Sequence, residues 1–569
     1  MDRYGMVRYD NAHIIIIQKR RVRFAMDILA LGPAGAPGKS EVHPHRAAVM
    51  LALKQKERDM WLHSEIKTLG DIPRYYGSAT PDKIALIDND VKRSFSELDK
   101  RTNRLANFVI DQGFPKQTHI AFLGKNSSRY FESVFGVNKA GCALVPMNWR
   151  LAVPELCTVV TDAGIKLMLV DEDSYDLALA VQRECSQPFE LIKFTNTWLD
   201  SLDCSDDDPG VDVYQDQTAL LMYTSGTTGK PKGVQLTHLG FNFMRFCEDN
   251  EPAYDWQPED IKMLVMPNFH LVGSGLSIQA LYNGATLSIV AAFDPTLVLE
   301  AIKRDKPTIC AMVPTAIQML MENAPRDADF SSLRLIMYAG SPISPALLSQ
   351  AIKRFNCKFM QFYGATESGG AATLLRPEQH DLDDEQSLKS CGTPLPWIQI
   401  EVVSPEGKRM PPGEIGELII RSPTMFRGYW NNPTATAAVM RDGWYHSGDA
   451  GYKDENGLIY IIDRVKDMIV TGGENVYSIE VEQVLDSHPE IKKSAVVGRP
   501  CEKWGEMIVG VVVLEDGATV TEKELEELCR SRIAGYKVPK AFVFVDEFPL
   551  SATGKILKRV LRDEVSVDH

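Results

Sequence analysis

Short apolar runs recur along the chain, and each is followed by turn residues and then by an amphipathic stretch. The clearest runs lie at residues 120–123, 167–170, 220–223, 308–313 and 335–338. This alternation is the strand–helix rhythm of a mostly parallel sheet covered by helices. We therefore expect an α/β fold, and the 569 residues are enough for more than two domains.

The pattern becomes hairpin-like in the last third of the chain. Residues 398–403 and 416–420 are apolar runs, and a further run at 458–462 predicts another strand. After Asp463 the chain restarts with a predicted helix at Ser478, so a boundary is predicted near Asp463. The predicted division is an N-terminal extension without a readable pattern, a large domain and a small α+β domain: 1–59, 60–462 and 463–569.

Composition excludes several classes of protein. The chain has 62 Lys and Arg against 76 Asp and Glu, a net charge of −14, so general nucleic-acid binding is not expected. Its ten cysteines include no C-x-x-C pair and no cysteine–histidine cluster of zinc spacing, which favours free thiols in a reducing compartment. No run approaches the ~18 apolar residues of a membrane-spanning helix. We expect a cytoplasmic protein with at most peripheral membrane contact.

The most informative stretch is residues 223–233, Tyr-Thr-Ser-Gly-Thr-Thr-Gly-Lys-Pro-Lys-Gly, which follows an apolar strand. Glycines let backbone N–H groups approach an anion closely, and hydroxyl and lysine side chains add donors and positive charge. The stretch is not a Walker A loop, because Thr224 replaces the first glycine and Pro231 follows Lys230 in place of Ser or Thr. A P-loop kinase or GTPase is therefore not favoured. A phosphate-binding loop of another kind and a flexible hydrophilic loop remain as interpretations.

Six motifs in a fixed order resemble those of the adenylate-forming superfamily, and of its acyl-CoA synthetases and fatty-acid–CoA ligases in particular. The loop at 223–233 is the first. The others are Gln-Phe-Tyr-Gly-Ala-Thr-Glu-Ser at 361–368, Tyr-His-Ser-Gly-Asp at 445–449, Asp-Arg-Val-Lys-Asp at 463–467, Gly-Gly-Glu-Asn with Glu-Val-Glu within 472–482, and Ser-Ala-Thr-Gly-Lys at 551–555. The resemblance covers most of the chain, from about residue 72 to about residue 562. It implies a large N-terminal domain of mostly parallel sheets with helices and a small β-barrel-like part, and a small mobile C-terminal domain.

The resemblance implies a reaction in two steps. A carboxylate attacks the α-phosphorus of ATP and gives an acyl-adenylate and pyrophosphate, and the thiol of coenzyme A then displaces AMP. The carboxylate needs no general base, because a carboxylic acid with a pKa near ~4 is already ionised at neutral pH. Catalysis is therefore expected to rest on positioning and charge neutralisation. The implied partners are a small carboxylic acid, ATP and coenzyme A, with Mg²⁺ as the metal.

The resemblance also assigns catalytic roles. Glu367, a hard oxygen donor, and Thr224 would hold Mg²⁺. Lys555 would reach the carboxylate and α-phosphate oxygens during adenylation. Lys466 would be the hinge about which the small domain rotates, and this rotation would exchange Lys555 for the coenzyme A side of that domain. The implied coenzyme A-side residues are Gly472, Gly473 and Glu474.

The nucleotide would contact residues from several motifs. Asp449 would accept hydrogen bonds from both ribose hydroxyls, which an acceptor-only carboxylate does well. Arg464 offers a rigid fork of donors to ribose or phosphate. The full implied set is Thr224, Ser225, Gly226, Thr227, Thr228, Gly229, Lys230, Gly340, Ser341, Pro342, Tyr363, Gly364, Thr366, Asp449, Arg464 and Lys555.

His270 resembles the histidine of a further family motif, which borders the acyl pocket, and it is interpreted either as catalytic or as structural. Gly273 and Gly275 follow it. Small residues here leave room for a long or bulky acid, which favours a medium- or long-chain fatty acid. Glycines at these positions equally suit close backbone packing.

Other functions remain open at this point. The acid can be an aryl or another carboxylic acid, and the acceptor can be an amine or the thiol of a carrier protein. The Gly-Gly-Glu-Asn sequence at 472–475 resembles the acyl-CoA ligase version of its motif and favours coenzyme A. A non-catalytic nucleotide-binding protein of the same fold is the remote alternative, and a homodimer is compatible with the sequence.

Overall fold

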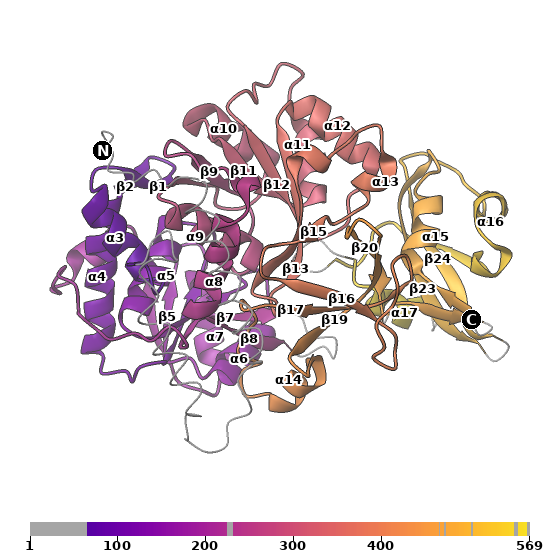
Figure 1. Ribbon diagram of the computed structural model, residues 1–569. Coiled ribbons are helices and arrows are strands. Elements are labelled where there is room, and N and C mark those ends of the chain that lie inside the picture. The colour runs from indigo at the N-terminus through magenta and orange to yellow at the C-terminus, as the bar shows by residue number, and fades with distance from the viewer. Residues whose placement is uncertain are drawn as a thin grey trace, which may run out of the picture. The chain divides into compact units, whose positions relative to one another are not determined.

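A computed structural model describes residues 65–224, 231–465, 467–471, 474–501, 504–550 and 556–565 (Figure 1). Contacts between α-carbons divide the chain into two compact units. The first comprises the chain up to Leu388 with Pro394–Gln399 and Ile420–Tyr445, and the second comprises Lys389–Thr393, Ile400–Ile419 and the chain from His446.

The first unit contains a six-stranded sheet with the strand order β6-β5-β3-β4-β7-β8. Neighbouring strands run parallel except β7 and β8, which form an antiparallel pair. Strands β3, β4 and β5 are buried along their whole length, as expected for parallel strands enclosed by helices. The strands are β3 (His119–Leu123), β4 (Ala143–Met147), β5 (Leu167–Val170), β6 (Glu190–Lys193), β7 (Thr218–Thr224) and β8 (Lys232–Thr237).

A nine-stranded sheet has the order β15-β14-β13-β12-β11-β9-β10-β1-β2. Strands β13 to β1 in this order run parallel, while β2 and β14 form antiparallel pairs with β1 and β13. Segments that follow the parallel strands therefore leave the sheet at one edge. The strands are β1 (Ile84–Asp88), β2 (Val91–Ser94), β9 (Ile261–Leu264), β10 (Thr286–Ile289), β11 (Ile309–Met312), β12 (Leu335–Tyr338), β13 (Lys358–Ala365), β14 (Gly370–Leu375) and β15 (Thr393–Pro394).

Helices cover these two sheets (Figure 1). They are α3 (Asp71–Ala79), α4 (Phe95–Asp111), α5 (Ser128–Lys139), α6 (Val153–Ala163), α7 (Tyr175–Glu184), α8 (His238–Asp249), α9 (Leu271–Tyr282), α10 (Pro295–Asp305), α11 (Pro314–Asn323), α12 (Pro345–Phe355) and α13 (Glu385–Leu388), with 3-10 turns η2 (Leu199–Ser201), η3 (Pro252–Tyr254) and η4 (Pro377–Gln379). Helix α14 (Pro433–Val439) contacts strand β18 (Met440–Arg441) of another sheet. The starts of the helices follow local chemistry. Ser94 and Glu97 form a capping box at α4, and Asp294 accepts hydrogen bonds from two N–H groups of the first turn of α10, where proline occupies the first position.

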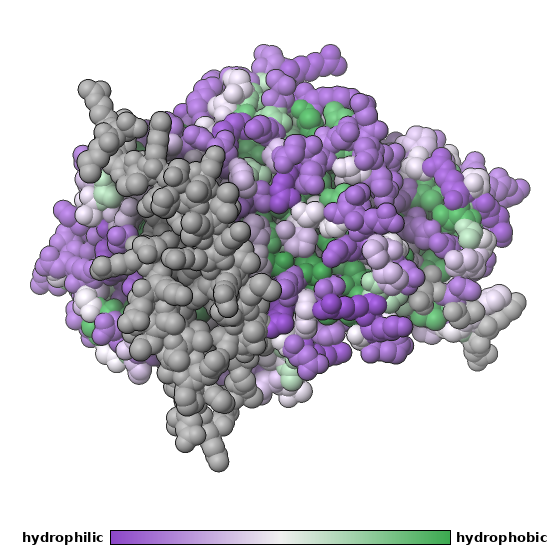
Figure 2. All heavy atoms as spheres, viewed as in Figure 1, coloured by the Kyte–Doolittle hydropathy of each residue, from purple (hydrophilic) through white to green (hydrophobic). Residues whose placement is uncertain are grey.

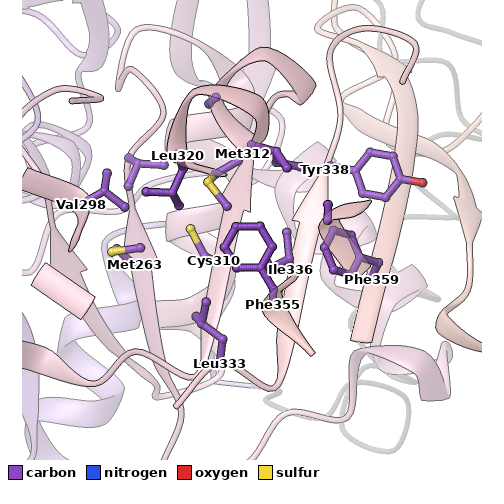
Figure 3. Close-up of a cluster of buried hydrophobic side chains, with 14 of the residues drawn as sticks. Met263, Val298, Cys310, Met312, Leu320, Leu333, Ile336, Tyr338, Phe355 and Phe359 are labelled. Atoms are coloured by element: carbon purple, nitrogen blue, oxygen red, sulfur yellow. The ribbon is translucent and has the colours of Figure 1, made fainter. Parts of the chain in front are cut away.

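The core beside the nine-stranded sheet is built from strand and helix side chains (Figure 3). Strands β9, β11 and β12 supply one layer, and helices α10, α11 and α12 supply the other. Burying one such side chain contributes about 1.5–3 kcal/mol relative to leaving it exposed. Representative members are Met263, Cys310, Ile336, Val298, Leu320 and Phe355.

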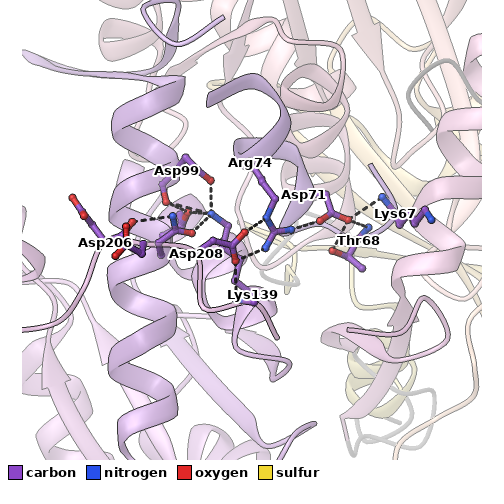
Figure 4. Close-up of polar contacts among 12 residues, drawn as sticks. Lys67, Thr68, Asp71, Arg74, Asp99, Lys139, Asp206 and Asp208 are labelled. Carbon is purple, nitrogen blue, oxygen red and sulfur yellow. Dashed lines mark hydrogen bonds and ion pairs between the residues drawn. The ribbon is translucent and has the colours of Figure 1, made fainter. Parts of the chain in front are cut away.

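A polar network connects α4 directly to α5, and connects α3 to α4 through the loop at residues 206–208, where the Asp206 carbonyl accepts from Asn103 of α4 (Figure 4). Arg74 of α3 pairs with Asp71 and with Asp208, whose Oδ1 is 3.0 Å from Arg74 Nη2. Lys139 of α5 is fully buried and forms an ion pair with Asp99 of α4. Burial lowers the pKa of Lys139 to about 8, and the Asp99 carboxylate opposes that shift. Because a buried ammonium group without partners is costly, these contacts favour one packing arrangement of the three helices.

The strands after β15 form two further sheets. One has the order β16-β17-β19-β18 with β20 paired to β19, and the other has the order β22-β21-β24-β23 with β25 paired to β24. Helices α15, α16 and α17 supply buried side chains to cores that they share with the second of these sheets. The elements are β16 (Gln399–Val403), β17 (Gly416–Arg421), β18 (Met440–Arg441), β19 (Trp444–Lys453), β20 (Ile459–Arg464), β21 (Ile469–Thr471), β22 (Glu474–Val476), α15 (Ser478–Leu485), β23 (Ile491–Cys501), β24 (Gly505–Leu514), α16 (Glu522–Arg532), η5 (Gly535–Lys537), β25 (Ala541–Phe544) and α17 (Lys558–Val565).

The structure confirms the predicted α/β fold. Strands β5 and β12 coincide with the predicted runs, and β3, β7 and β11 lie within two residues of theirs. The helix predicted at Ser478 is α15, with Val481 and Leu485 buried and Val484 packed against the same core. The domain boundary near Asp463 stays a prediction.

On the face shown in Figure 2, hydrophilic residues cover most of the described surface. Among the described residues, no helix has the length and apolar character needed to cross a membrane. The ten cysteines form no disulfide bond with one another.

Candidate active site

The predicted phosphate loop joins strands β7 and β8. Thr224, the last residue of β7, lies opposite Lys232, the first residue of β8. A strand therefore follows the loop where a helix follows a Walker A loop, which agrees with the exclusion of that motif. The loop residues predicted to contact phosphate lie outside the described residues: Ser225, Gly226, Thr227, Thr228, Gly229 and Lys230.

Glu367 is buried. Tyr429 connects it to the hairpin of strands β7 and β8 that carries the predicted phosphate loop, called here the loop hairpin. The Tyr429 hydroxyl donates a hydrogen bond of 2.7 Å to Glu367 Oε1. The Lys232 ammonium lies 5.0 Å from the centre of the Tyr429 ring, a cation–π contact. Tyr429 also forms an antiparallel bridge with Val234 of β8. Glu367 and Thr224 are the two predicted metal ligands. These contacts bring Glu367 into one region with the strand pair that carries Thr224.

Sequence reasoning did not identify Tyr429. It lies outside the six motifs, in Phe-Arg-Gly-Tyr-Trp at 426–430, and a group of aromatic residues around one glycine indicates only packing. The structure shows how this segment is held. The Trp430 N–H donates to the Gly233 carbonyl at 2.7 Å, and the Phe426 N–H donates to the Glu367 carbonyl at 3.0 Å. Backbone bonds to the loop hairpin and to Glu367 therefore fix the position of Tyr429.

The oxygen atoms in this region fit a magnesium ion. Mg²⁺ takes carboxylate and hydroxyl oxygens and usually completes its shell with water and substrate phosphates. Glu367 offers a buried carboxylate with one oxygen held by Tyr429, and Thr224 offers a hydroxyl at the end of β7. One carboxylate and one hydroxyl suit a metal that enters together with a nucleotide.

Tyr363 and Gly364 lie in strand β13, where a bulge interrupts the pairing with β14. A β-carbon at Gly364 would lie 2.0 Å from the Gly370 carbonyl oxygen, so only glycine fits there. Thr366 and Glu367 follow in the turn between these strands. The Ser368 hydroxyl closes this turn by accepting from the Ala365 N–H at 2.9 Å. The backbone thus holds the predicted nucleotide motif in one arrangement.

The predicted adenine-side loop leaves the same sheet beside this motif. Gly340, Ser341 and Pro342 follow β12, whose Tyr338 lies opposite Gln361 of the parallel neighbour β13. Gly340 has a φ of 91°, in the left-handed region that favours glycine. Because β12 and β13 are adjacent and parallel, residues 340–342 follow the carboxyl end of β12, and residues 363–366 lie at and just after the carboxyl end of β13, where ligands bind in open α/β sheets.

His270 is half-buried and precedes helix α9. Its ring centre lies 4.6 Å from that of Phe269. Asn126, which follows β3 of the other sheet, fixes the preceding segment. Its Nδ2 donates to the Met266 carbonyl at 3.0 Å, and its Oδ1 accepts from the Asn268 N–H at 2.8 Å. Asn126 thereby ties the two sheets together beside His270, a role that its sequence context did not signal.

Gly273 and Gly275 lie in the first turns of α9. A β-carbon at Gly273 would lie 2.1 Å from the Pro267 carbonyl oxygen, so close backbone packing requires glycine there. At Gly275 a β-carbon would lie 3.0 Å from the Leu271 side chain. The packing interpretation therefore accounts for Gly273, and this glycine is no argument for a long acid.

Asp449 and Arg464 form a pair in the second unit. They lie opposite each other in strands β19 and β20, and Arg464 Nη1 is 2.6 Å from Asp449 Oδ1. The Asp449 N–H donates to Ser447 Oγ at 3.0 Å, and the Gly448 N–H donates to Glu417 Oε1 at 3.1 Å. These bonds hold the Ser-Gly-Asp motif, and two predicted nucleotide residues share one hairpin.

The remaining predicted residues belong to the second unit. Glu474 is exposed, begins strand β22 and pairs with Thr471 of β21. Four predicted residues lie outside the part of the chain that the structure describes: Lys466, Gly472, Gly473 and Lys555.

Known proteins match this chain along most of its length. Residues 75–430 match the AMP-binding enzyme family, and residues 480–555 match the AMP-binding enzyme C-terminal domain. A fatty acid–[acyl-carrier-protein] ligase of Streptomyces coeruleorubidus is 35% identical over 507 residues, 88% of this chain and 97% of that protein. A feruloyl-CoA synthase of an Amycolatopsis species is 36% identical over 500 residues, with 87% and 98% covered. A long-chain-fatty-acid–CoA ligase of Mycobacterium tuberculosis is 33% identical over 510 residues, with 88% and 99% covered.

Solved structures share the fold. The o-succinylbenzoate CoA synthetase of Bacillus subtilis, in complex with its acyl-adenylate intermediate, has a TM-score of 0.77 and 30% identity, with 87% of this chain and 98% of that chain covered. The ATP-bound MatB protein of Rhodopseudomonas palustris has a TM-score of 0.79 and 27% identity, with 88% and 99% covered.

Proposed function

This chain belongs to the family of AMP-binding enzymes, and from that premise we propose that it joins a carboxylic acid to coenzyme A through an acyl-adenylate. It is an adenylate-forming acid–thiol ligase. The observation that carries the detailed proposal is the contact of Tyr429 with Glu367 and with Lys232, because it joins the loop hairpin to the carboxylate suited to Mg²⁺.

In the proposed first step, the carboxylate of the acid attacks the α-phosphorus of ATP and pyrophosphate leaves. Residues 224–230 would bind the β- and γ-phosphates, while Thr224 and Glu367 would hold Mg²⁺, which neutralises phosphate charge. Residues 340–342, Tyr363, Gly364 and Thr366 would line the adenine and the α-phosphate. This assignment is supported by their place at or just after the carboxyl ends of two adjacent parallel strands.

The second unit would supply the remaining nucleotide contacts. Asp449 would bind the ribose hydroxyls, and Arg464, already paired with it, would add guanidinium donors to ribose or phosphate. Lys555 would stabilise the developing charge on the reacting oxygens. After adenylation, rotation at Lys466 would replace Lys555 by residues 472–474, so that the thiol of coenzyme A attacks the acyl carbon and AMP leaves.

We propose a medium- or long-chain fatty acid as the substrate, with His270 and Gly275 beside its chain. The names of two relatives support this choice, a long-chain-fatty-acid–CoA ligase and a fatty acid–[acyl-carrier-protein] ligase. The second candidate is an aryl acid, which the feruloyl-CoA synthase favours at 36% identity.

The decisive experiment measures pyrophosphate, orthophosphate and AMP with ATP, Mg²⁺ and a panel of saturated fatty acids and aryl acids. Each acid is tested alone, with coenzyme A, with an acyl carrier protein and with an amine. With a fatty acid and coenzyme A, the proposal predicts pyrophosphate, AMP and thioester in equal amounts. With the fatty acid alone, it predicts pyrophosphate and acyl-adenylate. Turnover restricted to aryl acids, or to another acceptor, would replace that part of the proposal. Release of ADP and orthophosphate would contradict the reaction itself.

A further inference from the structure

Helix α17 follows the predicted catalytic lysine directly, since it begins at Lys558, three residues after Lys555. Residues 551–555, which contain Lys555, are called here the lysine loop. The described residues on either side of this loop are paired with each other. Leu550 and Ile556 form an antiparallel bridge, and the Leu557 N–H donates to the Pro549 carbonyl at 2.8 Å. Both ends of the loop are therefore fixed at the start of α17, and any displacement of this helix moves the base of the loop.

One face of α17 packs against strands of its own unit, the second unit. Leu561 and Val565 are buried in a cluster with strands β23 and β24. Lys558 and Arg562 share this face, because residues four apart lie one above the other on a helix. Arg559 lies on another face, where its side chain is 67% exposed.

Lys558 contacts helix α15 at two residues. Its Nζ lies 2.7 Å from Glu482 Oε1, and it also donates to the Ser478 hydroxyl. Ser478 in turn is bound to Asp463, whose Oδ2 accepts from the Ser478 N–H at 2.6 Å. Glu482 Oε1 also accepts from the Val496 N–H at 2.7 Å. Lys558 thus connects the lysine loop to the first residue of the Asp-Arg-Val-Lys-Asp motif.

Arg562 connects the same helix to the last residue of that motif. Its Nη2 lies 2.6 Å from Asp467 Oδ1, and the two side chains are only 28% and 12% exposed. Partly buried ion pairs are screened less by solvent than exposed pairs are. Asp463 and Asp467 stand on either side of Lys466 in the sequence, so both anchors of α17 lead to the predicted hinge motif.

We propose that Lys558 and Arg562 are positioning residues that set the place of Lys555 relative to the hinge motif. Each cation is held by a carboxylate of the second unit, so its proposed effect on Lys555 passes through the loop. The inference rests on the proposed function, because it takes Lys555 as the lysine of the adenylation step. A displacement of about 1 Å in a catalytic group costs on the order of a hundredfold in rate.

The test compares Arg562→Met with the matched control Arg559→Met on the exposed face of the same helix. ATP–pyrophosphate exchange reports adenylation, and thioester formation from supplied acyl-adenylate reports the second step. We expect Arg562→Met to lower exchange by roughly tenfold to a hundredfold while thioester formation stays within about twofold. Arg559→Met should leave both steps within about twofold of the parent.

Two further variants separate positioning from folding. Arg562→Asp should lower exchange at least as much as Arg562→Met, because two carboxylates would then face each other. The double variant Asp467→Arg with Arg562→Asp should recover exchange, because the ion pair is restored with reversed charges. Equal loss of both steps in Arg562→Met, exchange as fast as in Arg559→Met, or no recovery in the double variant would overturn the inference. A parent enzyme that makes no pyrophosphate with any acid would instead refute the proposed function.

Discussion

The Asp449 carboxylate and the Arg464 guanidinium face each other across strands β19 and β20, with Arg464 Nη1 2.6 Å from Asp449 Oδ1. The two residues come from different sequence motifs, and the hairpin makes them direct neighbours. The Asp449 side chain is 11% exposed and that of Arg464 is 46% exposed. A ribose bound by Asp449 would therefore lie within reach of the Arg464 donors.

Asp449→Asn should raise the KM for ATP by roughly tenfold to a hundredfold. The amide replaces one of the two acceptor oxygens, and Arg464 no longer faces a negative charge. Glu455→Gln, in the exposed turn between the same two strands, is the matched control and should change KM by less than about twofold. Steady-state kinetics with ATP as the varied substrate measures both. An unchanged KM in Asp449→Asn would remove this residue from the nucleotide site.

Glu367→Gln should raise the Mg²⁺ concentration needed for half-maximal activity, because the variant keeps an acceptor for Tyr429 but loses the negative charge. Tyr429→Phe should have a smaller effect, a loss of roughly tenfold in activity, since the missing hydroxyl only orients Glu367. Titration of pyrophosphate release with Mg²⁺ measures both variants. Equal Mg²⁺ dependence in the parent and Glu367→Gln would contradict the metal assignment.

Lys555→Ala should abolish most acyl-adenylate formation. One desolvated charge contact at ~4 Å and an effective dielectric of ~20 is worth about 4 kcal/mol, roughly a thousandfold in rate. Lys540→Ala, at an exposed position, is the control and should keep its activity. ATP–pyrophosphate exchange decides the matter, and near-normal exchange in Lys555→Ala would refute the role of this lysine.

Lys466→Pro should impair thioester formation more than adenylation. Proline fixes φ near −65° and restricts rotation at the predicted hinge. The two half-reactions are measured separately, adenylation by exchange and thioester formation from supplied acyl-adenylate and coenzyme A. An equal loss in both would argue against a hinge at this residue.

His238 should make the enzyme less stable in acid. Its Nδ1 accepts a hydrogen bond of 3.1 Å from the Leu69 N–H, and burial lowers its pKa from 6.5 to about 3. The unfolded chain binds this proton below about pH 6.5 and the folded chain only near pH 3. Stability is therefore lost as the pH falls through this window, by about 2 kcal/mol from this group between pH 6.5 and 5.

His238→Gln keeps an acceptor for Leu69 but binds no proton, so its stability should fall less steeply with acid. His488→Gln is the control, because its Nδ1 also accepts a backbone N–H, from Glu490. Urea unfolding at pH 6.5 and pH 5 measures the difference. A His238→Gln profile parallel to that of the parent would exclude this histidine as a source of acid sensitivity.

The sequence predicted the parts of the fold that depend on local pattern. Strands at 167–170 and 335–338 are continuous apolar runs because parallel strands are buried on both faces. The start of α15 at Ser478 was also predictable, since its apolar residues repeat with helical spacing.

Contacts between distant segments were not predictable. Tyr429 and Glu367 are 62 residues apart, and no motif connects them. The requirement for glycine at Gly273 depends on the path of the backbone at Pro267, which a sequence does not specify. The pairing of Arg562 with Asp467 likewise follows only from the packing of α17.

The central claim, that the acid reacts as its adenylate, is tested most directly with a carboxylic acid labelled with oxygen-18 in both carboxylate oxygens. If the carboxylate attacks the α-phosphorus and thiolysis then breaks the acyl carbon–oxygen bond, each AMP released carries one labelled oxygen. Mass spectrometry of the nucleotides after turnover with coenzyme A should show this label in AMP. Label found in orthophosphate, with unlabelled AMP or ADP as the nucleotide product, would contradict the account.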